Sequence, residues 1–182
     1  MEAAKKETYF KNTIFVFVGD HGIRGNAGDL FPKAYTSKGL TCEHVPLLFY
    51  WPKMLPAKRI HDVCSQVDIL PSIASIAKVP YYNNTFGRDL FDTLALKTGN
   101  SISNEKFAFI IDHDVKTVGL VSAEYYFLKD TKTGKEEMVS VINNEEIKPA
   151  AETDSVKKYM STLTDAWHET AKYLLLNNKK KN

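Results

Sequence analysis

Two short apolar runs dominate the first third of the chain, at residues 13–18 and 45–51. Each is rich in β-branched and aromatic side chains, and Gly19 ends the first run while Pro52 ends the second. Their short length and abrupt ends favour strands over buried helices. A strand that is apolar at every position is typical of the middle of a parallel sheet, where both faces are covered. The first run therefore predicts that other parts of the same sheet precede it in the full protein.

A helix is predicted after the second run. Residues 60–67 fit a third strand or an extended segment, and Asp68 can cap the helix that follows. Pro71 falls in its first turn, where proline costs little, and Pro80 ends it. The apolar stripe of this helix consists of Ile69, Ile73, Ile76 and Ala77.

The rest of the chain reads as a loop, a small antiparallel sheet and a final helix. Residues 81–104 are expected to form the loop, with a turn or short strand near residues 87–91. The pattern then predicts four short strands at residues 107–111, 117–121, 125–128 and 138–142. Residues 130–134 suit a hairpin turn, and residues 154–176 form an amphipathic helix whose apolar side faces the sheet.

The composition excludes several function classes. The 182 residues are 43% hydrophobic and 25% charged, as in an ordinary globular domain. A formal net charge of +2 provides no basic face, so we expect no nucleic-acid partner. No apolar run reaches the roughly 18 residues that cross a bilayer. Two cysteines are too few for a disulfide framework or for a zinc site of their own.

Candidate chemistry lies where the first strand ends, in the sequence Gly19-Asp20-His21-Gly22. In open α/β sheets, ligands bind beyond the carboxyl ends of the strands. A carboxylate followed by an imidazole offers one oxygen and one nitrogen ligand to a divalent ion. Neighbours on a regular strand point to opposite faces, so both side chains can meet one ion only where the strand breaks. The alternative is a turn in which Asp20 caps a helix and His21 is simply packed.

Four segments, in the same order and spacing, resemble the sulfatase and phosphotransferase branch of the alkaline phosphatase superfamily. The first resembles the family's apolar strand that ends in an Asp-His-Gly metal motif. The others resemble its His-Val-Pro strand, its Val-Asp-Ile segment and its Gly-Arg-Asp-Leu segment. The four segments are residues 13–22, 43–52, 65–73 and 86–91.

Within this superfamily, the Asp20-His21 pair makes the chain most similar to the lipoteichoic acid synthase-like phosphoglycerol transferases and the phosphoethanolamine transferases. The resemblance implies an α/β fold: the C-terminal part of an alkaline phosphatase-like sandwich, with a mostly parallel sheet flanked by helices, a small antiparallel sheet and a C-terminal helix. Residues 1–100 would be the C-terminal part of the catalytic domain. Residues 101–182 would add the small sheet and the helix of the same domain.

The resemblance also implies roles for single residues. Asp20 and His21 match the family's ligands of a catalytic divalent ion, for which zinc or manganese is favoured over calcium or magnesium. His44 matches the family's histidine whose side chain lies near the anionic group of the substrate or near an additional metal. The alternative for His44 is a histidine at the start of a strand, bonded to backbone. The cluster Asp112-His113-Asp114 could also hold a metal, but its place between two short strands favours a plain turn.

No residue of this chain matches the family's nucleophile, which is a threonine, serine or modified cysteine in the N-terminal half. We therefore expect a fragment of a metal-dependent sulfatase-like hydrolase or phosphotransferase, acting on sulfate or phosphate esters through a covalent intermediate. The isolated chain is expected to be inactive. The alternative function is a non-catalytic binding or assembly module that retains the fold.

The expected partners follow from this interpretation. They are a sulfate- or phosphate-ester substrate and the missing N-terminal part of the domain. Self-association through an exposed sheet edge is a further expectation. By family resemblance, the protein is expected to act outside the cytoplasm, in the periplasm or on the outer face of a membrane, with a membrane-anchored parent.

Overall fold

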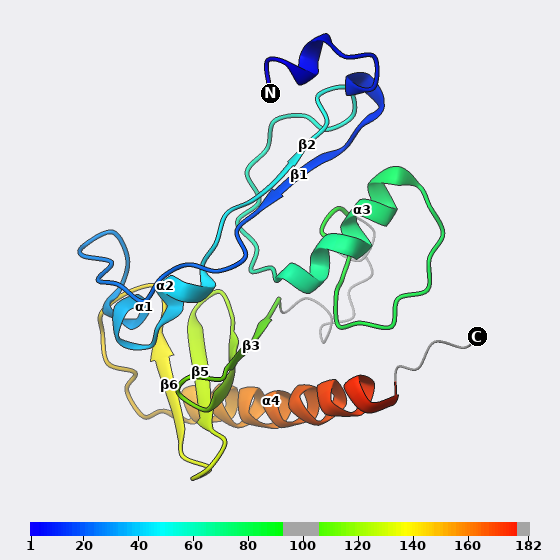
Figure 1. Cartoon of the computed structure of the whole chain (residues 1–182). Coiled ribbons are helices and arrows are strands. Elements are labelled where there is room, and N and C mark those ends of the chain that lie inside the picture. Colours follow the sequence, from blue (N-terminus) through cyan, green and yellow to red (C-terminus); the bar gives the residue numbers. More distant parts are fainter. Residues whose placement is uncertain (93–105, 178–182) are drawn as a thin grey trace.

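Two antiparallel β-sheets carry the fold in the computed structural model, which describes residues 1–92 and 106–177. The first sheet is a two-stranded ribbon of β1 (Phe15–Val18) and β2 (Leu47–Tyr50). The second has the order β3-β4-β5-β6, formed by Ala108–Asp112, Thr117–Val121, Tyr125–Asp130 and Glu136–Ser140. In Figure 1 the ribbon projects from one end of the molecule, while α4 (Ala151–Asn177) lies along one face of the second sheet.

Short helices occupy the connections. Before and within the ribbon these are η1 (Ala4–Lys6), η2 (Phe10–Asn12), α1 (Lys33–Ser37) and α2 (Leu40–Glu43). After the ribbon, η3 (Gln66–Asp68) runs directly into α3 (Ile69–Ala77). The predicted α/β class, with a small antiparallel sheet and a C-terminal helix, is confirmed.

The two apolar runs pair with each other, and they pair antiparallel, with Val18 opposite Leu47. A mostly parallel sheet is therefore wrong for the described residues, in which every pairing is antiparallel. An unbroken apolar run indicates that both faces are covered, but it carries no information on strand direction. Phe17 and Leu48, opposite each other in this register, are 46% and 54% exposed. The described residues therefore leave this face of the ribbon uncovered.

The four-stranded sheet is covered on both faces. Successive residues of β5 point to opposite sides, so Tyr126 and Phe127 belong to different cores. Phe127 packs with Met160 of α4, and both are fully buried. Tyr126 packs with Leu40 of α2 on the other side. The segment between β1 and β2 thus shares a core with the C-terminal sheet.

Most predicted elements are present with shifted ends. The four C-terminal strands lie within about two residues of their expected positions. The final helix begins three residues early, at Ala151. Residues 60–67 do not form the expected strand: they are irregular until η3 begins at Gln66. The next helix ends at Ala77, three residues before Pro80, and its C-cap residue Lys78 has a left-handed conformation with φ of 55°.

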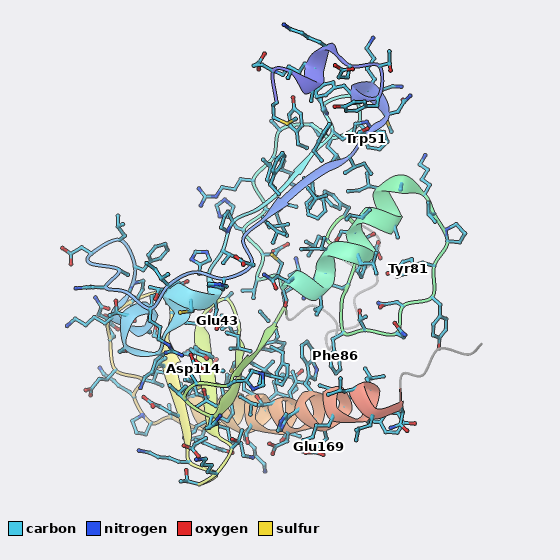
Figure 2. The ribbon with its side chains drawn as sticks, in the orientation of Figure 1. Glu43, Trp51, Tyr81, Phe86, Asp114 and Glu169 are labelled. Carbon is cyan, nitrogen blue, oxygen red and sulfur yellow. The ribbon has the colours of Figure 1, made fainter. Side chains whose placement is uncertain are left out.

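The loop after α3 reaches α4 through one aromatic pair. Phe86 stacks on Trp167, with ring centroids 5.0 Å apart and ring planes only 5° from parallel. Figure 2 shows Phe86 directed from this loop toward α4. Offset aromatic stacking adds about 1 kcal/mol beyond the buried area. This contact joins the region of α3 to the C-terminal helix.

The buried carboxylate of Asp68 links two of the segments that resemble the family. Asp68 and Ser65 form a capping box, in which the Ser65 backbone N–H donates to Asp68 Oδ2 at 2.8 Å. Asp68 is the N-cap residue of α3, as predicted, but its side chain makes no capping hydrogen bond to that helix and instead completes the capping box of Ser65 at the start of η3. The Arg88 N–H donates to Asp68 Oδ1 at 2.9 Å, so one carboxylate holds both segments. Asp68 is only 3% exposed, which makes these bonds costly to lose.

Gly87 is required by the close approach of these two segments. A Cβ atom at this position would lie 1.9 Å from the backbone oxygen of Val67. We predict that Gly87→Ala lowers the free energy of unfolding by about 3 kcal/mol, because the two backbones must move apart. Chemical denaturation of this chain measures the change.

Gly25→Ala is the matched control, since its Cβ would come no closer than 3.9 Å to another atom. This variant should stay within about 0.5 kcal/mol of the wild type. Equal stability of the two variants would contradict the close packing of Gly87 on Val67.

Candidate functional site

The end of β1 lies against the segment that leads into β2. The Gly19 N–H donates to the Pro46 carbonyl at 3.1 Å, and the Gly22 N–H donates to the Cys42 carbonyl at 2.6 Å. A Cβ at Gly22 would lie 2.1 Å from the Thr41 oxygen. The glycines on either side of the Asp-His pair therefore permit a backbone contact that no side chain would allow. This contact brings residues 19–22 beside residues 41–46.

Asp20 and His21 meet on the surface of this loop. The His21 Nδ1–H donates to the Gly22 carbonyl at 2.7 Å, because a carbonyl can only accept. That bond fixes the tautomer and leaves the lone pair of Nε2 free. The Nε2 atom lies 3.7 Å from Asp20 Oδ2, and the two side chains are 74% and 91% exposed.

The local electrostatics act on the two side chains in opposite ways: they keep Asp20 charged, which favours a cation, but they favour a proton on His21, which competes with one. The backbone hydrogen bond from His21, followed by the charge of His21, lowers the pKa of Asp20. The hydrogen bond to the Gly22 carbonyl, followed by the charge of Asp20, raises the pKa of His21. Asp20 is therefore a carboxylate at neutral pH, as metal coordination requires.

The donor set fits a divalent ion in chemistry and spacing. Two ligands about 2.1 Å from a tetrahedral zinc ion are themselves roughly 3.4 Å apart, close to the separation of Nε2 and Oδ2. The bond from Nδ1 to a backbone carbonyl is the support that metal-binding histidines normally have. Among the described residues, however, no group of three or more His, Cys, Asp or Glu side chains could hold an ion. The pair offers two ligands of a shell that needs at least two more.

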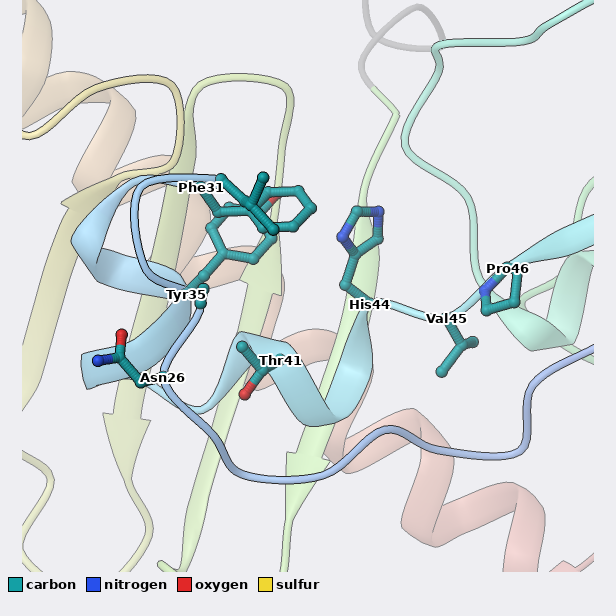
Figure 3. Close-up of a pocket in the computed structure, with 9 residues that line it drawn as sticks. Asn26, Phe31, Tyr35, Thr41, His44, Val45 and Pro46 are labelled. Carbon is teal, nitrogen blue, oxygen red and sulfur yellow. The ribbon is translucent and has the colours of Figure 1, made fainter.

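His44 is the C-cap residue of α2, and within the described part of the chain it belongs to no group of metal-ligating side chains. Its ring contacts Phe31 edge-on, with centroids 5.3 Å apart, and lies 5.6 Å from the ring of Tyr35. These three rings border a cavity of about 430 Å³ (Figure 3). The cavity is lined by Asn26, Ala27, Leu30, Phe31, Tyr35, Thr41, His44, Val45 and Pro46. The structure thus places the predicted substrate residue at a cavity, separate from the Asp20-His21 pair.

The Asp112-His113-Asp114 cluster forms a turn, as favoured from the sequence. Asp112 Oδ1 accepts hydrogen bonds from the amides of Asp114 and Val115 at 3.0 and 3.2 Å. Its other oxygen accepts a hydrogen bond from the Arg24 guanidinium. Burial alone would raise the pKa of Asp112, but the bonds from Val115 and Arg24 outweigh burial and lower it. Asp112 is therefore a structural carboxylate rather than a metal ligand.

Two residues that the sequence analysis did not single out touch the loop of the Asp-His pair. Arg24 follows that loop and ties it to β3 through Asp112, 88 positions away. Gln66, at the start of η3, donates from Nε2 to the carbonyls of Gly19 and Asp20 at 2.8 and 2.9 Å. A signal existed for Gln66, because it lies inside the segment of residues 65–73 that resembles the family. Nothing local marked Arg24 among the loop charges.

We predict that Arg24 and Asp112 stabilise the fold jointly. A double-mutant cycle of Arg24→Met and Asp112→Asn should give a coupling of about 1 kcal/mol at pH 7, because the guanidinium stays partly exposed. The lowered pKa of Asp112 means that the coupling is complete above the ordinary carboxyl pKa and is lost as pH falls through the lower folded value. Denaturation should therefore show the same coupling at pH 7 and pH 5 and a loss only below about pH 4. A coupling that has vanished by pH 5 would contradict this account.

The sulfatase family model matches residues 1–79, a segment that contains Asp20, His21 and His44. Over 102 residues the chain is 29% identical to arylsulfatase K of Gallus gallus, a match that covers 56% of this chain and 19% of the relative. Identity to arylsulfatase K of Xenopus laevis is 32% over 91 residues, covering 50% and 17%. Identity to arylsulfatase A of Homo sapiens is 29% over 105 residues, covering 54% and 21%. The chain thus spans about a fifth of the length of these relatives.

A solved structure shares the fold of the whole chain. It is that of BT4656 in complex with its substrate D-glucosamine-2-N,6-O-disulfate, with a TM-score of 0.55 and 18% identity. The similarity covers 100% of this chain and 38% of that one. The α/β fold is therefore consistent with the C-terminal part of an alkaline phosphatase-like sandwich, and the comparisons together support the sulfatase-like superfamily.

Proposed function

We propose that this chain is part of a metal-dependent, sulfatase-type hydrolase that acts on sulfate esters. The observation that carries the proposal is the meeting of the Asp20 carboxylate and the His21 Nε2 atom at the end of β1. It lies inside the segment that matches the sulfatase model. The substrate named for the structurally similar BT4656, a disulfated glucosamine, supports a sulfate ester as the substrate.

Asp20 and His21 would hold the divalent cation. One carboxylate oxygen beside one imidazole nitrogen suits zinc or manganese better than calcium or magnesium, which prefer all-oxygen shells. When bound, such a cation supplies Lewis-acid stabilisation of charge on the ester oxygens. Asp20 contributes a charged oxygen ligand, and the bond from Nδ1 to Gly22 keeps the His21 ring in the orientation that presents Nε2.

His44 and its cavity would bind the substrate. The imidazole can donate a hydrogen bond to the sulfate group, while Phe31 and Tyr35 provide apolar surface for the organic part of the ester. Asn26 and Thr41 add polar groups to the same lining. A cavity of about 430 Å³ falls in the range of roughly 300–1,000 Å³ that is usual for small-molecule sites.

The nucleophile and the remaining metal ligands would come from an N-terminal part of the same domain. The exposed apolar side chains of the ribbon support a covering part. In this proposal residues 1–100 and 101–182 belong to one domain. The boundary between them lies outside the described residues.

Two other functions have support. Asp20-His21, in place of the Asp-Asn of many arylsulfatases, favours transfer of a phosphoglycerol or phosphoethanolamine group as the second candidate. Among the described residues only two candidate ligands meet, which favours the third, a non-catalytic module. For each, the location would be extracytoplasmic, and the parent membrane-anchored. Within the described residues, no helix has the length and apolarity needed to cross a membrane.

Metal binding is the first prediction of this proposal. We expect the whole protein, with its N-terminal part present, to bind zinc or manganese, and Asp20→Ala or His21→Ala to remove that binding, because each deletes one of the two ligands that this chain provides. Metal content after dialysis, together with titration, measures it. His113→Ala is the control, since His113 is an exposed histidine in the turn before β4. Binding that survives in both mutants, or that His113→Ala removes, would contradict the site.

Substrate class is the second prediction. With its N-terminal part present, the whole protein should hydrolyse 4-nitrophenyl sulfate faster than 4-nitrophenyl phosphate. Asp20→Ala should lower kcat by about a hundredfold or more, as the loss of a metal ligand implies. Activity confined to phosphodiesters would favour the transferase. A metal-loaded protein that turns over neither ester class would favour the non-catalytic module.

A further inference from the structure

The side-chain amide of Gln66 bonds two successive backbone carbonyls at the end of β1. Its Nε2 atom donates to Gly19 O at 2.8 Å and to Asp20 O at 2.9 Å. Successive carbonyls of an extended strand point to opposite edges, so one donor cannot reach both. Both bonds are present here because the backbone leaves the strand conformation between Gly19 and Asp20. Gln66 therefore bonds the backbone at the point where the strand conformation ends.

This break is what lets Asp20 and His21 approach each other. In a continued strand the two side chains would point to opposite faces. In the structure their closest ligating atoms are 3.7 Å apart. Gly19 and Gly22 permit the break, since their neighbours leave no room for a Cβ. Glycine permits many other conformations as well, so it does not select this one.

Gln66 itself is held in place by buried structure. It is the first residue of η3, whose capping box joins Ser65 to Asp68. Asp68 is 3% exposed and is also bonded by the Arg88 amide. The orientation of the Gln66 amide is determined by its partners, because two carbonyl acceptors require the nitrogen and exclude the oxygen. A rigid element thus presents two donors to the loop.

We propose that Gln66 is a positioning residue for the Asp20-His21 metal site: it holds the backbone break that makes the two ligands converge. It bonds only backbone of the loop, so it acts through Asp20 and His21 rather than on substrate or metal. The inference rests on the proposed function for its metal, but the conformation of the loop can be measured without one. The Gly22 amide, bonded to the Cys42 carbonyl, is the natural probe of that conformation.

The test compares Gln66→Met with the wild-type chain. Methionine keeps the length of the side chain but cannot donate a hydrogen bond. We expect the Gly22 amide of this chain to exchange with solvent about five to ten times faster. In the whole protein, with its N-terminal part present, the same substitution should raise the dissociation constant for zinc about tenfold, as for other groups that orient metal ligands. The midpoint of global unfolding should barely change, because Gln66 is exposed. Val67→Ala, which alters the neighbouring exposed side chain of η3, should change neither quantity.

The outcomes separate the two proposals. Faster Gly22 exchange together with weaker zinc binding supports the inference. Unchanged Gly22 exchange, or unchanged zinc affinity in a variant whose wild type binds zinc, overturns it and leaves the metal site standing. A whole protein, with its N-terminal part present, that binds no zinc overturns the proposed function. In that case, faster exchange of the Gly22 amide in Gln66→Met still supports the claim that Gln66 stabilises the conformation of the loop. Unchanged exchange overturns that claim as well.

Discussion

Backbone crowding at the end of β1 is the constraint on which the candidate site depends. Residues 19–22 run so close to residues 41–46 that a Cβ at Gly22 would lie 2.1 Å from a backbone oxygen. The close contact ends the strand, brings the Asp-His pair out of the extended conformation and sets it beside the segment that carries His44. Main-chain contacts alone thus bring residues 19–22 beside residues 41–46, although the His44 side chain lines a cavity that neither Asp20 nor His21 borders.

This arrangement is supported from two directions. On one side of the loop, the buried Asp68 carboxylate joins η3 to the Arg88 backbone, and η3 presents Gln66 to the break in the strand. Beyond the loop, Arg24 bonds Asp112, while Leu40 packs with Tyr126 of the C-terminal sheet. The segments that resemble the family therefore have different roles in these two sets of contacts. The Asp-His segment offers ligands, whereas the Val-Asp-Ile and Gly-Arg-Asp-Leu segments hold the scaffold.

The sequence predicted the elements better than their arrangement. Alternating and helical patterns placed the four C-terminal strands and both longer helices, because each pattern reports a buried face. The apolar runs before Gly19 and Pro52 gave strands but not their antiparallel pairing, since direction leaves no trace in a run that is apolar throughout. At the site, the motif gave Asp20 and His21. Arg24 and Asp112 could not be paired, because their contact joins positions 88 residues apart and nothing in the sequence near Arg24 points to the Asp112 cluster. Gln66 lay inside a recognised segment, yet its role depends on a backbone break that only coordinates reveal.

The proposed site requires that Asp20 and His21 bind one ion together. Crystals of the protein grown with zinc, measured on both sides of the zinc absorption edge, test this directly. We predict an anomalous peak about 2.0–2.2 Å from both an Asp20 carboxylate oxygen and His21 Nε2, with Nδ1 still bonded to the Gly22 carbonyl. A zinc peak elsewhere, or an Asp20 and His21 that point apart in the presence of zinc, would contradict the account.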